Sequence, residues 1–280
     1  MSKTVGALVV SGALMFACAK ASLAQEAFGA APDADVKGPL TSDTAVDLTA
    51  TPRFWYMFST FANGKALPGQ KSLTSTASVS FPMAGAAISA RLGVLPDTTF
   101  VFSALDGPGT EKLDQLSVGD TQIGHIRENI NRQDLEFLAQ TAIYGSNWSW
   151  IVGARYEHET TPESSVSFGI VPVATKLTGP SLNDYTVKAG MTGAIPISAS
   201  PDVRMFGNIL ALGGVELQNG SVTNGLVGTD LAVGVQYLFA SDISLDARYR
   251  AIVSFLVDAP PGNGSHYVSH GPMLGLNIHF

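Results

Sequence analysis

The sequence predicts an all-β protein, a transmembrane antiparallel β-barrel of about ten strands, with eight or twelve strands as the alternatives. Apolar and polar residues alternate along many stretches, which gives each strand one apolar and one polar face. These stretches run to roughly 10–14 residues, as a tilted crossing of a bilayer requires, whereas the strands of soluble sandwiches are usually shorter. The connections alternate between short turns and long loops, which is typical of outer-membrane barrels.

The N-terminus has the features of an export signal. Lys3 supplies positive charge, residues 5–17 form an apolar run, and Ser22-Leu23-Ala24 has small residues at the usual cleavage spacing. Residues 1–24 are therefore predicted to be a signal peptide, residues 25–50 a periplasmic lead-in without periodicity, and residues 51–280 the barrel. The only cysteine, Cys18, lies inside the signal, so the exported chain would hold no disulfide.

The strands are predicted in order along the chain. The first opens with the aromatic run 53–58, an alternating stretch ends at 86–94, and a short strand follows at 100–102. Alternation returns in the later strands, which are 133–143, 148–157, 185–192, 202–214, 231–239, 243–255 and the closing strand up to residue 280. Residues 166–173 could add one more strand.

The connections follow the same order. Short turns are predicted at 95–97, 144–147, 196–201 and 240–242, and longer outer loops at 105–131, 159–182, 215–224 and 257–265. Counting back from a periplasmic C-terminus places every short turn on the periplasmic side. The two longest loops could constrict a pore or bind a partner at the surface.

The closing strand carries a pattern of its own. Leu274, Leu276 and Phe280 alternate with polar or small residues, and the chain stops on the aromatic ring. Gly275, Ile278 and Phe280 resemble the C-terminal insertion signal of bacterial outer-membrane barrels, although Met273 stands where that signal usually has a polar residue. The resemblance implies recognition by the barrel-assembly machinery and a location in the outer membrane.

Aromatic residues support the same architecture. Eight of them lie near the ends of predicted strands on the apolar face, where interfacial girdles contact lipid headgroups. They are Trp148, Trp150, Tyr156, Tyr185, Tyr237, Phe239, Phe255 and Phe280.

The opposite face of the strands would line the lumen. It carries charges of both signs, which either set the ion selectivity of a water-filled pore or pair across a narrow lumen and close it. The candidate lumen residues are Arg91, Arg132, Asp134, Glu136, Arg155, Glu157, Lys188, Arg204, Asp230, Asp246, Arg248 and Arg250.

Several short landmarks resemble the Legionella-type major outer-membrane protein family, which is described as pore-forming. They are the segments 134–136, 150–156, 190–194, 206–214 and 269–280. The resemblance covers roughly residues 130–280, departs in the N-terminal third, and implies a porin-like channel for small polar solutes without assigning any pore residue.

Other function classes have less support. The formal charge of −7 argues against a nucleic-acid partner, no glycine-rich nucleotide loop is present, and the histidine spacing suggests no metal site or cofactor. A lipid-modifying enzyme would have to use His266, Ser269 and His270, but on a strand Ser269 faces away from both histidines. The expectation is a non-enzymatic barrel of unknown oligomeric state, with a closed adhesin-type barrel as the main alternative to a porin.

Overall fold

The computed structural model describes residues 46–65, 73–118, 121–168, 171–177, 181–197, 202–257 and 266–280. These residues form eleven strands: β1 (Val46–Lys65), β2 (Leu73–Leu92), β3 (Leu95–Val118), β4 (Thr121–Ala142), β5 (Trp148–Phe168), β6 (Val171–Leu177), β7 (Ser181–Pro196), β8 (Val203–Gln218), β9 (Ser221–Ala240), β10 (Ile243–Leu256) and β11 (His266–His279). The predicted signal peptide lies outside the described residues. No helix in the described part of the chain is long and apolar enough to span a membrane.

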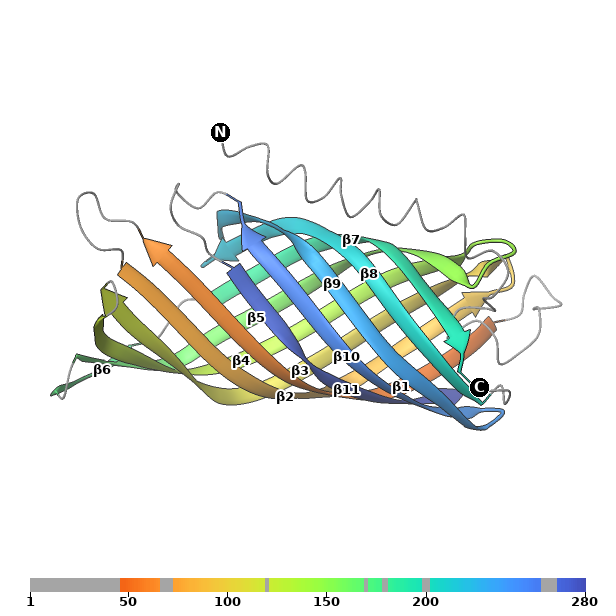
Figure 1. The fold of residues 1–280 in the computed structure, drawn as a ribbon, viewed down its shortest axis with the longest axis horizontal. Coiled ribbons are helices and arrows are strands. Elements are labelled where there is room, and N and C mark those ends of the chain that lie inside the picture. Colours follow the sequence, from red (N-terminus) through yellow and green to blue (C-terminus); the bar gives the residue numbers. More distant parts are fainter. Residues whose placement is uncertain are drawn as a thin grey trace.

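Ten of the strands close into one antiparallel barrel (Figure 1). Neighbours in sequence pair with each other, β5 pairs with β7, and β1 meets β11 through pairs such as Thr49 with His279 and Phe54 with Leu274. The short β6 adds to the far end of β5 and is not a member of the ring. The predicted all-β barrel and its strand count of ten are therefore confirmed.

The two ends of the barrel differ. In Figure 1, β6 lies at the end opposite the C-terminus. We call the end that carries Phe280 the proximal end and the end that carries β6 the distal end. The longest strands are β3 to β5, with 21 to 24 residues each, and the shortest in the ring are β10 and β11, with 14 each.

Four sequence predictions about boundaries were wrong. Strand β1 begins at Val46, so the last five residues of the predicted lead-in 25–50 belong to the barrel. The predicted loops 105–131 and 159–182 are mostly strand, because β3 and β4 stay paired as far as Val118 and Thr121 and β4 and β5 as far as Gly124 and Phe168. Apolar and polar residues do not alternate in these two segments, because a strand that meets water on both faces can carry polar residues on both.

The fourth wrong prediction is the loop 215–224. Strands β8 and β9 pair through Gln218 and Ser221, and only Asn219 and Gly220 lie between them. Both of these residues have positive φ, 51° and 83°. Asn-Gly with two positive φ angles is the preferred two-residue hairpin turn, which matches the twist of its strands.

Candidate functional site

All twelve predicted lumen residues lie on inward-facing positions of their strands. The two-residue period of a strand puts them on the same face as buried neighbours, whereas the outward positions between them are exposed or half-buried. Arg91 is on β2; Arg132, Asp134 and Glu136 are on β4; Arg155 and Glu157 are on β5; Lys188 is on β7; Arg204 is on β8; Asp230 is on β9; Asp246, Arg248 and Arg250 are on β10.

Four of these residues form a central ion cluster: Glu136, Lys188, Asp230 and Arg250. Lys188 Nζ lies 2.5 Å from Glu136 Oε1 and 2.5 Å from Asp230 Oδ2. Arg250 Nη2 lies 2.9 Å from Glu136 Oε1 and 2.6 Å from Asp230 Oδ2. Two cations thus face two carboxylates, and the cluster carries no net formal charge.

The central ion cluster reaches across the whole lumen. Its members come from β4, β7, β9 and β10, and β4 and β10 are five places apart in a ring of ten strands. A contact between Glu136 and Arg250 therefore joins opposite walls of the barrel. Small barrels are narrow enough for side chains to fill the interior, and this contact is a direct case.

An apolar layer fills the lumen beside the cluster, and sequence reasoning missed it. Trp55, Met57, Phe81 and Met83 are fully buried on the inward faces of β1 and β2. They pack in one cluster with Leu105, Ile130, Leu212, Ile252 and Met273. The Arg250 guanidinium lies 5.5 Å from the centre of the Trp55 ring, a cation–π distance, so the layer and the ion cluster form one plug.

A signal for the apolar layer was present in the sequence. The run 53–58 is apolar at nearly every position, so both of its faces need an apolar environment. One face is accounted for by the exterior of the barrel, where Phe54, Tyr56 and Phe58 are exposed. The other face, with Trp55 and Met57, then had to meet an apolar lumen.

A second group of charges lies distal to the plug. Arg155 pairs with Asp134 and with Glu157 at 2.5 Å and 2.8 Å, and Arg132 pairs with Glu157 at 2.6 Å. The strand register places Glu157 opposite Asp184 on β7.

The same register continues into β8, where Asp184 lies opposite Glu216. Asp184 and Glu216 were not among the predicted lumen residues. Tyr267 Oη donates to Glu216 Oε2 at 2.8 Å, and Asn224 Nδ2 donates to Oε1 at 2.6 Å. Asp184 Oδ1 is buried and has no hydrogen-bond partner among the described residues.

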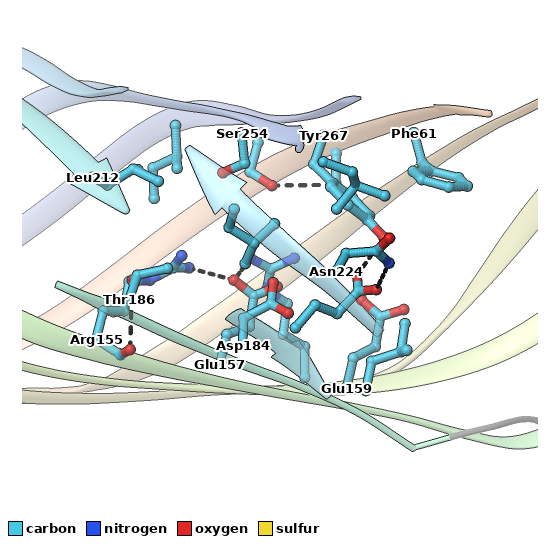
Figure 2. A pocket seen from close by; sticks show the side chains of 18 of the residues that line it. Phe61, Arg155, Glu157, Glu159, Asp184, Thr186, Leu212, Asn224, Ser254 and Tyr267 are labelled. Atoms are coloured by element: carbon cyan, nitrogen blue, oxygen red, sulfur yellow. Dashed lines mark hydrogen bonds and ion pairs between the residues drawn. The ribbon is translucent and has the colours of Figure 1, made fainter. Parts of the chain in front are cut away.

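The plug separates two cavities. The distal vestibule, as we call the larger cavity, has a volume of 290 Å³ and is lined by residues that include Phe61, Arg132, Glu157, Asp184, Glu216 and Tyr267 (Figure 2). The smaller proximal cavity has a volume of 80 Å³ and is lined by residues that include Arg53, Glu136, Asp246 and Arg248. The two share no lining residue.

Charges near the proximal end are also paired. Arg91 Nη2 lies 3.0 Å from Asp47 Oδ2, and Arg248 forms an ion pair with Asp246. The Arg248 guanidinium lies 4.9 Å from the centre of the Phe206 ring. Side chains thus occupy the lumen on the proximal side of the plug as well.

The exterior is apolar and carries the predicted aromatics. Trp150, Tyr185, Tyr237, Phe239, Phe255 and Phe280 are exposed, and Trp148 and Tyr156 are half-buried on the same outward face. Two pairs contact each other, Tyr237 with Phe239 at 4.7 Å and Tyr156 with Tyr185 at 5.0 Å between ring centres.

The proposed insertion-signal residues lie in and directly after β11. Ile278 pairs with Ala50 and Gly275 with Arg53, and both pairs belong to the seam that closes the ring. The Phe280 amide donates to the Leu48 carbonyl at 2.9 Å.

Residues that could support catalysis are separated. Ser269 points inward and bonds with Ser59 Oγ at 3.1 Å, whereas His270 points outward, stacks on Phe58 and bonds with the Tyr249 hydroxyl. Among the described residues no group of three or more histidine, cysteine, aspartate or glutamate side chains is arranged to hold a metal ion.

Comparisons with known proteins give structural likeness only. No protein-family model and no curated protein matches the chain. The outer membrane protease OmpT from Escherichia coli is 12% identical, with 91% of this chain and 100% of that chain covered and a TM-score of 0.47. The translocator domain of the autotransporter NalP from Neisseria meningitidis is 12% identical over 97% of each chain, with a TM-score of 0.45. An outer membrane channel from Pseudomonas putida F1 is 11% identical, covers 90% and 100%, and has a TM-score of 0.37. None of these likenesses assigns an activity to this chain.

Proposed function

We propose that this chain is an outer-membrane β-barrel that is closed at its centre and that binds a ligand at its distal end. An outer-membrane location is supported by the outward face, where apolar and aromatic side chains such as Val152, Val187 and Trp150 are exposed. Strands with an apolar outer face and a charged inner face are stable where lipid surrounds the barrel.

The observation that carries the closed state is the contact between Arg250 and Glu136 from opposite walls. A porin-like channel, as predicted from the sequence, needs a continuous aqueous path for polar solutes. The central ion cluster and the apolar layer leave separate cavities of 290 and 80 Å³ instead. This favours the alternative from the sequence, a closed barrel that acts at its outer end, although the segments 105–131 and 159–182 contribute there mainly as strands.

Conductance across a planar lipid bilayer tests the closed state. We expect the purified wild-type barrel to insert without current steps. We expect the double variant Trp55→Ala/Arg250→Ala to conduct, because it removes one large side chain from each half of the plug and the cation–π contact between the halves. Heat-dependent gel mobility verifies that each barrel is folded, and Phe81→Ala/Met83→Ala provides a second opened variant. Reproducible porin-like steps from the wild type would overturn the proposal and restore the diffusion channel.

A further inference from the structure

The distal vestibule has two unlike walls. Figure 2 shows Glu157, Glu159 and Asp184 on one side and the rings of Phe61 and Tyr267 on the other. The two rings stack with 4.6 Å between their centres. Leu212 and Ile252 extend the apolar wall toward the plug. A ligand that fills this space must therefore be polar on one side and apolar on the other.

The acidic wall has more negative than positive charge. Arg132 and Arg155 are both paired with Glu157, and Arg155 also with Asp134. Among the described residues Asp184 and Glu216 form no ion pair, although the positive charges of Arg155 and Arg132 act on Asp184. The register places the two carboxylates opposite each other, and Glu157 lies opposite Asp184 on its other side. Like charges on directly opposed positions destabilise a sheet, and a cation beside Asp184 would offset that repulsion.

Two buried polar atoms in this vestibule lack partners. Asp184 Oδ1 is an acceptor without a donor, and Arg132 Nε is a donor without an acceptor, in a side chain that is only 4% exposed. Buried polar atoms are nearly always hydrogen-bonded, so each unpaired one indicates a missing partner. Arg132 and Asp184 both line the vestibule, and a ligand that carries both a donor and an acceptor matches their chemistry.

We propose that the distal vestibule binds a small organic cation whose ammonium donates to Asp184 and whose hydrogen-bond acceptor meets Arg132. Its apolar or aromatic body packs against Phe61 and Tyr267. The volume of 290 Å³ is at the lower end of small-molecule sites. A bare metal ion fits less well, because it would leave the apolar wall unused. The inference rests on the proposed closed barrel, whose plug forms the floor of the vestibule.

Calorimetric titration of the full purified barrel tests the site. The probe is phenylalaninamide, which has an ammonium, a carbonyl acceptor and a ring. We expect it to bind, N-acetylphenylalaninamide to fail because it lacks the charge, and alaninamide to bind more weakly because it lacks the ring. Asp184→Asn keeps the shape and removes the charge, and we expect it to weaken binding about tenfold or more. Glu216→Gln provides a second variant, and Asp47→Asn at the proximal end is the matched control, with no expected effect.

Each outcome has a clear meaning. No binding of phenylalaninamide by the folded wild type, equal binding of its acetylated form, or unchanged binding by both Asp184→Asn and Glu216→Gln would overturn the inference. The conductance experiment separates this failure from that of the proposed function. If the wild-type barrel is electrically silent but does not bind phenylalaninamide, the ligand inference is wrong and the closed barrel stands. If the wild-type barrel conducts and binds phenylalaninamide, the binding site stands and the closed barrel is wrong.

Discussion

Glu136→Gln tests whether the central ion cluster holds the barrel together. Glu136 Oε1 lies 2.5 Å from Lys188 Nζ and 2.9 Å from Arg250 Nη2, and the Glu136 side chain is 7% exposed. The substitution keeps the size of the side chain but leaves two cations facing Asp230 alone. Removal of one member of a buried ion pair costs about 3–5 kcal/mol, because the charge left behind is neither paired nor hydrated.

The free energy of unfolding can be measured by urea titration of the barrel in lipid vesicles. Tryptophan fluorescence is a suitable signal, since Trp55 lies beside Arg250 in the plug. Glu163→Gln makes the same chemical change at an exposed position of β5 and should stay within about 0.5 kcal/mol of the wild type. A loss below about 1 kcal/mol for Glu136→Gln is the size expected of a hydrated surface pair and would refute the plug as a buried, mutually dependent cluster.

Two further predictions concern the closing seam. Gly271 has φ of +155°, and a Cβ there would lie 2.0 Å from the Tyr56 carbonyl oxygen, so Gly271→Ala should lower the free energy of unfolding by about 1–3 kcal/mol. In the same titration Gly213→Ala, where the nearest atom is 3.8 Å away, should change it far less, and equal effects would contradict the steric reasoning. Deletion of Phe280 should reduce the amount of barrel assembled in cell membranes, quantified by heat-dependent gel mobility, but not refolding into detergent. Normal assembly in cells would show that Phe280 is not part of an insertion signal.

Alternation along the sequence was enough to predict the barrel and the inward position of its charges. A residue such as Lys188 faces inward because its neighbours Val187 and Ala189 face outward, and this is local information. The ion-pair partners of these charges could not be predicted from local alternation. Arg250 and Glu136 are 114 residues apart in sequence, and only the closure of the ring brings them together.

The distal vestibule was missed for a different reason. Glu216 lies in the predicted loop 215–224, and Asp184 directly precedes the predicted start of a strand at Tyr185. Both residues fall where the sequence placed the boundary between a strand and a loop, so alternation was not followed far enough to mark their side chains as inward-facing. Trp55 and Phe81 were missed because apolar residues on an inward face break the simple rule of polar lumen and apolar exterior.

The cross-lumen contact also bears on how the barrel closes. Before the ring closes, four strands separate β4 from β10 in the open sheet, so Glu136 does not have Arg250 beside it. Pairs between adjacent strands, such as Arg250 with Asp230, do not need the closed ring, but Glu136 would lack its partner from the opposite wall. A buried ion without its partner costs several kcal/mol. Formation of the seam between β1 and β11 therefore completes the ion pairing inside the lumen, which couples closure of the ring to the burial of Glu136.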